Sequence, residues 1–180
     1  MFASSNCWIR KAQIVKRVMP AGYSGLQILL HWLMAAMVLF LLVFGESMKD
    51  SMRATREGNS LGAGDELLAD AHYWVGLAVI ALAVLRVLLR LKQGRSAPAE
   101  GGSPLASRIA AAMHLLFYVL LIVVPATGLL AFYVSSDFGE IHEIGKPVFI
   151  VLILAHAVAA LLHQFWMKDG TLRRMLVPGR

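Results

Sequence analysis

The sequence predicts an all-α integral membrane protein, a bundle of four transmembrane helices with both termini in the cytoplasm. The chain of 180 residues is 58% hydrophobic and has a mean hydropathy of +0.67, which is too apolar for an ordinary soluble domain. Only 16% of the residues are charged, and they gather between four apolar runs. Each run is long enough to cross a bilayer, which takes about 20 apolar residues.

The four runs define a membrane domain of residues 23–175, between a basic tail of residues 1–22 and a short tail of residues 176–180. The spans are expected at approximately 23–45, 71–91, 105–134 and 142–167. Pro125 inside the third span predicts a kink. Glycines at 58, 62 and 64 argue against a long regular element in the 46–70 segment, which is expected to be a loop.

The distribution of charge predicts the orientation of the bundle. The first tail carries four basic residues and no acid, and the 92–108 connector and the C-terminal tail are also basic, whereas the 46–70 segment is net acidic. The positive-inside rule therefore places both tails and the connector in the cytoplasm of a bacterium, with the chain as a multi-pass protein of the inner membrane. The net charge of +6 is explained by topology and predicts no nucleic-acid partner. The single cysteine, Cys7, excludes an internal disulfide.

The fourth span carries three of the six histidines, although it is apolar enough to lie in lipid. His142 and His156 are fourteen residues apart, which is about 21 Å along a helix and about 40° short of four full turns. The two side chains therefore share a face, and His163 follows seven residues later. Ionisable groups inside a membrane are costly, so these histidines are expected to be functional.

The predicted topology gives each histidine a depth in the membrane. His31 and His156 fall in the inner half and can face each other, and His72 and His142 pair in the same way in the outer half. Two imidazoles facing across a bundle core are the ligands of a low-spin b-type haem. Histidines that only hydrogen-bond between helices are the alternative, as is zinc, but a closed zinc site needs four ligands close together.

Two further residues on the second span are expected to contact a cofactor. Arg86 lies fourteen residues after His72 on the same face, so it could bind a haem propionate; the alternative is that it extends to the cytoplasmic surface. Gly76 lies one turn after His72, where a missing side chain could leave room for a porphyrin or simply allow close helix packing.

Together these residues make the chain similar to the bacterial cytochrome b561 family of small four-helix dihaem membrane cytochromes, from about Tyr23 to Met175. The matching stretches are Gln27-Ile-Leu-Leu-His31-Trp32, His72-x-x-x-Gly76, Val84-Leu-Arg86-Val-Leu-Leu-Arg90-Leu-Lys92, His114-Leu-Leu-Phe-Tyr118, Pro125-Ala-Thr-Gly128-Leu, His142-Glu143, and His156 to His163 with Phe165-Trp166-x-Lys168-Asp169-x-Thr171-Leu172. The resemblance implies two b haems, ligated by His31/His156 and His72/His142. One branch of the family resembles superoxide oxidases, which reduce membrane ubiquinone. The basic N-terminal tail is longer here and the 135–141 turn is shorter than in that branch.

These observations favour a superoxide:ubiquinone oxidoreductase embedded in membrane lipid. Superoxide would be drawn by outer cations, for which the candidates are Lys49, Arg53, Arg56 and Lys146. His163 is the candidate proton donor or hydrogen-bond partner of the quinone, unless it is an ordinary histidine at a helix end. The alternative function is a cytochrome b subunit that relays electrons between quinone and a partner dehydrogenase or hydrogenase. A haem carrier or membrane sensor is a third hypothesis, against which two stacked histidine pairs argue.

Overall fold

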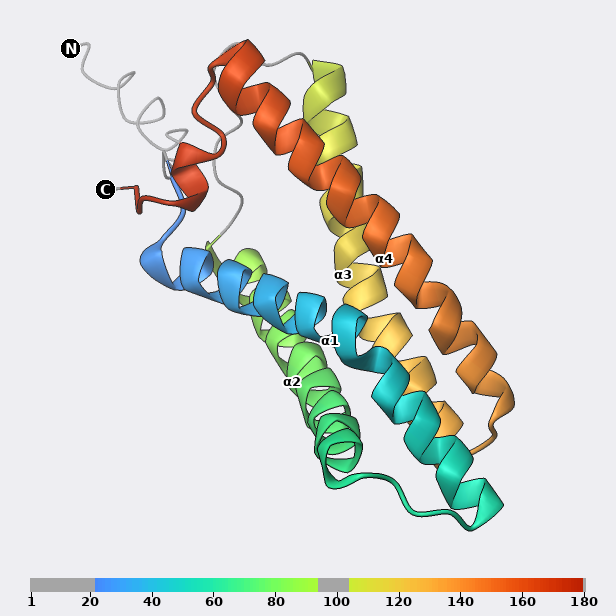
Figure 1. Ribbon diagram of the computed structural model, residues 1–180. Helices are drawn as coiled ribbons and strands as arrows, with labels where there is room; N and C mark the ends of the chain where they lie inside the picture. The colour runs from blue at the N-terminus through green and yellow to red at the C-terminus, as the bar shows by residue number, and fades with distance from the viewer. Residues whose placement is uncertain (1–21, 94–103, 180) are drawn as a thin grey trace, which may run out of the picture.

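The computed structural model describes residues 22–93 and 104–179, which form four long helices (Figure 1). Their bounds are α1 Gly25–Glu57, α2 Ala63–Gln93, α3 Pro104–Tyr133 and α4 Asp137–Leu162. A π-helical turn, η2 (His163–Met167), continues α4, and a 3₁₀ turn, η3 (Arg173–Met175), follows. All four helices are long and apolar enough to cross a membrane, which confirms the predicted bundle of four transmembrane helices. The basic N-terminal tail lies almost entirely outside the described residues.

Short-range hydrogen bonds set the ends of α1. Ser24 is its N-cap: the Ser24 hydroxyl accepts from the Gln27 amide at 3.3 Å, and the Gln27 side chain accepts from the Ser24 amide at 3.0 Å. This reciprocal capping box satisfies two backbone donors that a helix start otherwise leaves free. At the other end Gly58 adopts φ 70°, a left-handed conformation that glycine takes without steric cost.

The expected loop over residues 46–70 is wrong. α1 continues to Glu57, α2 begins at Ala63, and only residues 58–62 connect them. Of the three glycines that suggested a loop, Gly58 ends α1 and Gly64 lies in the first turn of α2 beside Asp65, an acid that favours a helix start. With 33 residues, α1 is about 50 Å long and extends past a hydrocarbon core of about 30 Å.

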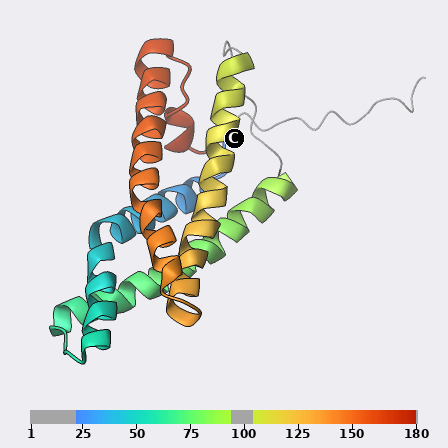
Figure 2. The ribbon, with the colours of Figure 1, turned by 90° about the vertical axis from the view of Figure 1, so that its right-hand side faces the viewer.

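The helices form two antiparallel hairpins. α1 packs against α2, α3 packs against α4, and α2 joins the hairpins through α3, whereas the backbones of α1 and α4 approach each other much less. The α1–α2 loop and the α3–α4 turn lie at one end of the bundle, and the N-terminus of α1 and the end of α4 lie at the other (Figures 1 and 2). The wider separation of α1 and α4 leaves room between these two helices for side chains or a ligand.

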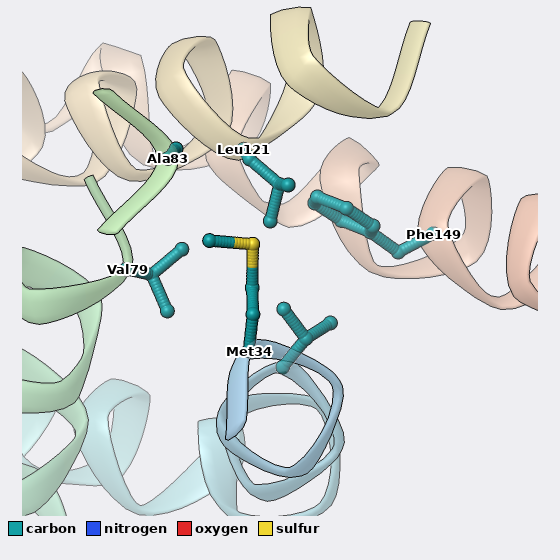
Figure 3. Close-up of a cluster of buried hydrophobic side chains, with 6 residues drawn as sticks. Met34, Val79, Ala83, Leu121 and Phe149 are labelled. Carbon is teal, nitrogen blue, oxygen red and sulfur yellow. The ribbon is translucent and has the colours of Figure 1, made fainter. Parts of the chain in front are cut away.

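An apolar layer fills the middle of the bundle. Figure 3 shows the Met34 side chain reaching from α1 toward Val79 and Leu121, with Phe149 entering from α4. Val79 is seven residues from both His72 and Arg86, and Phe149 is seven residues from both His142 and His156. The layer therefore lies midway between the two depths at which histidines were predicted. It consists of Met34, Val38, Val79, Ala83, Leu121 and Phe149.

Candidate functional site

The first histidine pair lies between α1 and α4 on the cytoplasmic side of the apolar layer, as the predicted orientation defines that side. The rings of His31 and His156 face each other with their centroids 6.3 Å apart. Both side chains are half-buried. The backbones of the helices that carry them, α1 and α4, make few close contacts with each other, so the two rings meet between helices that are not tightly packed together.

The second pair lies on the other side of the apolar layer. His72 of α2 and His142 of α4 have their ring centroids 6.1 Å apart. Two imidazoles on opposite sides of one metal ion, with metal–nitrogen bonds of about 2.0 Å, have ring centres about 6 Å apart. Both separations therefore suit one iron atom per pair, and the structure brings together the four residues in the two predicted pairs. Their role as ligands stays a prediction.

A backbone carbonyl fixes the tautomer of His142. Its Nδ1 lies 2.7 Å from the Val124 carbonyl oxygen of α3, which also accepts the Thr127 hydroxyl at 2.7 Å. A carbonyl oxygen can only accept, so Nδ1 carries the proton and Nε2 keeps its lone pair. Such an outer hydrogen bond orients a ligating imidazole and makes it a better base.

A cavity of about 710 Å³ opens beside the outer pair. His72 and His142 both line it, and the remaining lining is mostly apolar in its central part and charged at its outer end. Cofactor cavities typically have volumes of about 300–1,000 Å³. The Nδ1 atom of His72 is buried, and no hydrogen-bond partner for it occurs among the described residues. A cofactor with an apolar body and an iron atom fits this combination of space, apolar walls and facing ring nitrogens.

Three glycines shape this cavity, only one of which the sequence identified. A Cβ atom at Gly128 would lie 3.0 Å from the His142 ring, so the bare backbone of α3 lets that ring approach. At Gly45 a Cβ would make ordinary contact with His72 at 3.6 Å. At Gly76, the predicted residue, it would meet no atom of the described chain within 4 Å. The available signal was the cost of a glycine inside a helix, about 1 kcal/mol relative to alanine, which usually needs a packing reason.

Arg86 and His114 lie close to the inner histidine pair. Arg86 is half-buried and lies close enough to His31 to interact with it electrostatically, as expected for a residue at that depth. The ring centroid of His114 lies 5.5 Å from that of His156, and its Nδ1 lies 2.6 Å from the Ala110 carbonyl. The Arg90 guanidinium, one turn further along α2, lies 5.6 Å from the centre of the Tyr118 ring.

His163 belongs to a separate group at the far end of α4. Its Nδ1 is 2.5 Å from Oδ2 of Asp169, and Oδ1 of the same carboxylate accepts from the Thr171 amide at 2.9 Å. Burial alone would raise the pKa of Asp169, but the hydrogen bonds from His163 and Thr171 outweigh it and hold that pKa below its ordinary value. Sequence reasoning found His163 and missed Asp169.

Ion pairs at the outer end involve two of the cations expected to attract an anion. Lys49 of α1 binds Glu143 of α4 at 3.0 Å, and Lys146 of α4 binds Glu46 of α1 at 2.8 Å. The two pairs tie α1 to α4 on either side of the cavity mouth. The remaining candidates also line the cavity: Arg53, which is 3.8 Å from Asp50, and Arg56.

Residues 22–178 match the family described as prokaryotic cytochrome b561. This chain belongs to that family. It is 38% identical to cytochrome b562 of Cereibacter sphaeroides, over 87% of this chain and 96% of that protein. It is 30% identical to cytochrome b561 homolog 1 of Escherichia coli (86% and 96%) and 27% identical to the probable superoxide oxidase CybB of Yersinia pestis (88% and 97%).

Membership in the cytochrome b561 family makes the chain a multi-pass bacterial membrane cytochrome that binds haem b. The match begins at residue 22, three residues before α1, and ends three residues after η3. It therefore covers both histidine pairs, the apolar layer and the His163–Asp169 group.

Proposed function

We propose that this cytochrome b561 protein carries electrons across the membrane from superoxide at the outer face to ubiquinone near the cytoplasmic face. His72 and His142 hold one haem b, and His31 and His156 hold a second. Bound haem supplies a reversible one-electron carrier at each depth. Arg86 lies where a guanidinium can bind a propionate of the inner haem.

The arrangement of the two pairs is the observation that carries this proposal. Each pair has a ring separation suited to one iron, 6.3 Å and 6.1 Å, and the pairs lie on opposite sides of the apolar layer. The spacing of fourteen residues on α4 puts them about 21 Å apart along that helix. Two carriers stacked along the membrane normal favour a transmembrane relay over haem storage or sensing.

Residues at the two ends of the bundle support the choice of superoxide as electron donor and of quinone as acceptor. At the outer end the cavity reaches charged residues that include Arg53 and Arg56, whose side chains can attract a small anion. A relative of similar length bears the name probable superoxide oxidase. At the inner end His163 lies beyond the inner pair and has a carboxylate partner, as a proton donor to quinone requires.

Stopped-flow spectroscopy of the purified protein tests this function. After mixing, superoxide should reduce the haems, and added ubiquinone should reoxidise them. Both steps are followed by the change in haem absorbance. Absence of either reaction in protein with full haem content would refute the superoxide:ubiquinone activity.

The ion pairs at the outer mouth favour a second candidate, an electron-relay subunit of a membrane dehydrogenase or hydrogenase complex. Because Lys49 and Lys146 are paired with Glu143 and Glu46, little of their charge is left to attract an anion. A protein partner does not need such attraction. This candidate predicts that superoxide leaves the haems oxidised and that they are reduced only after a partner complex is added.

A further inference from the structure

We propose that Asp169 is a positioning residue that holds His163 in the tautomer needed to give a proton to the quinone. The inference rests on the proposed function, because it assigns the chemistry of the quinone end. It concerns a segment that lies outside the four helices, where the chain turns back from the end of α4.

Two unusual backbone features bring the imidazole and the carboxylate together. α4 ends in the π-helical turn η2, which begins at His163, and Lys168 follows with φ 53°. A π turn is rare and often marks a functional site, and a left-handed lysine has a conformational cost that glycine would avoid. Together they reverse the chain within six residues, so that Asp169 reaches back to the ring of His163.

The folded-back segment is fixed by contacts with α1. The Trp32 indole nitrogen donates to the Met175 carbonyl at 2.9 Å, and the Gly179 amide donates to the Tyr23 carbonyl at 3.1 Å. In Figure 1 this segment, drawn in red, crosses from the end of α4 to the blue start of α1. The side chain of Asp169 is only 7% exposed, while that of His163 is 27% exposed. The carboxylate is therefore enclosed, and its partner ring keeps an open edge.

The direction of the hydrogen bond determines what the ring can do. An ionised carboxylate only accepts, so His163 presents Nδ1–H to Asp169, which leaves Nε2 as the nitrogen available to another partner. When the ring is protonated, Nε2–H can donate to a quinone oxygen. Loss of that proton leaves the Nδ1–H tautomer, which the carboxylate already stabilises. Asp169 thus stabilises the protonated ring before the transfer and the Nδ1–H tautomer after it. The aspartate of a catalytic triad orients its histidine in the same way.

The step balances as two superoxide anions, one ubiquinone and two protons giving two dioxygen molecules and one ubiquinol. In each proton transfer an N–H bond of His163 breaks and an O–H bond of the quinol forms, and water on the cytoplasmic side reprotonates the ring. Asp169 stays ionised throughout. Oε1 of Gln164, the residue after His163 in the chain, is buried, has no donor among the described residues and could accept from a quinol hydroxyl.

The test uses the haem-loaded protein in lipid nanodiscs, reduced with one electron per haem and mixed with a short-chain ubiquinone. Asp169→Asn should lower the maximal rate of haem reoxidation by about a hundredfold, the lower end of the range for general acid catalysis. The quinone concentration for half-maximal rate should change less than twofold, and Asp169→Glu should recover part of the rate. Asp65→Asn, the same substitution at the start of α2, is the matched control and should react like the wild type.

A second measurement reads the tautomer of His163 directly and does not depend on the reaction rate. In the reduced protein, ¹⁵N NMR of labelled histidines, with His163→Gln used to assign the signal, should show neutral His163 protonated on Nδ1. Asp169→Asn should shift that population toward Nε2. A wild-type His163 protonated on Nε2, or an Asp169→Asn rate within twofold of wild type, would overturn the positioning role. Failure of ubiquinone to reoxidise the wild type would instead refute the proposed function, and with it the quinone as the acceptor of this proton.

Discussion

Three histidines of this bundle differ in the partner of their Nδ1 atom. His114 lies 2.6 Å from a carbonyl of its own helix, His142 lies 2.7 Å from a carbonyl of the neighbouring helix, and His163 has a carboxylate. A carbonyl partner leaves the imidazole neutral and its Nε2 available to a metal, whereas a carboxylate also stabilises the protonated ring. This difference supports the proposed roles of His142 as a haem ligand and of His163 as a proton donor.

Removal of one ligand from each pair should remove one haem. His31→Ala and His142→Ala should each retain about one haem per chain, because an iron with only one protein ligand is held weakly. Haem content per protein, measured from the pyridine haemochrome spectrum, checks this. His114→Ala removes a third inner imidazole that already bonds to Ala110, so it should keep both haems. Two haems in both ligand variants would refute the assigned pairs.

A bulky side chain at Gly76 should exclude the outer haem while leaving the protein folded. A Cβ atom there meets no atom of the described chain within 4 Å, so the side chain of Gly76→Leu would start in open space in the cavity that His72 also lines. We expect about one haem per chain and a helical circular dichroism spectrum like that of the wild type. Gly64→Leu, also in open space on α2, should keep both haems. Equal haem content in the two variants would show that Gly76 does not face the cofactor.

The ionisation of Asp169 should make the stability of the folded protein depend on pH. A carboxylate whose pKa is lowered in the folded state stabilises the fold above its unfolded pKa, and this contribution is lost as the pH falls through the folded pKa. Asp169→Asn should therefore melt below the wild type at pH 7, and the difference should shrink as the pH is lowered below about 4, the ordinary range for aspartate. A difference that does not change with pH would mean that the charge of Asp169 contributes nothing.

At the scale of the helices, the apolar layer determines how far apart the two sites lie. Phe149 is 6% exposed and lies midway between His142 and His156 on α4, and Val79 has the same place between His72 and Arg86 on α2. Close packing at this level keeps each ring opposite its partner. In a membrane such packing depends on van der Waals contact more than on exclusion of water.

Truncation within the layer should lower stability more than truncation toward lipid. Phe149→Ala leaves a cavity in the packed centre and should reduce the free energy of unfolding by about 3 kcal/mol. Val151→Ala, on the same helix at a side chain that is 66% exposed, should change it by less than about 0.5 kcal/mol. Thermal unfolding in detergent, followed by haem absorbance and by helical signal, compares the two. A Phe149→Ala protein as stable as Val151→Ala would show that the layer does not hold the bundle together.

The helices also show which parts of the structure could be predicted from sequence. Apolar length and histidine spacing gave the four spans and the two pairs, because both depend on regular helical geometry. The extension of α1 to Glu57 was missed because Gly58, Gly62 and Gly64 were weighed together, although only Gly58 has the left-handed conformation that ends the helix. Asp169 was missed because its approach to His163 depends on a π turn and on the backbone of Lys168, which helical spacing does not encode.

At the scale of the whole molecule, the α1–α2 loop and the α3–α4 turn lie at one end and the two ends of the described chain at the other (Figures 1 and 2). The orientation that we propose places the connections outside, by the excess of lysine and arginine in the tails and the 92–108 connector. In a Cys7→Ser background, Ser60→Cys in the α1–α2 loop should react with a membrane-impermeant maleimide in intact spheroplasts. Ser107→Cys, near the start of α3, should react only after the membrane is opened. The reverse pattern would invert the direction of electron flow.

The distance between the two histidine pairs also affects how electron transfer responds to the membrane potential. The apolar layer separates the two pairs by about 21 Å, or roughly two-thirds of a hydrocarbon core of about 30 Å. A full charge crossing the membrane works against about 2.3 kcal/mol per 100 mV, so an electron moving inward between the pairs works against about 1.5 kcal/mol. Under the proposed function, each turnover would therefore store part of its driving force as membrane voltage. The rate of electron transfer should then fall as the membrane voltage rises.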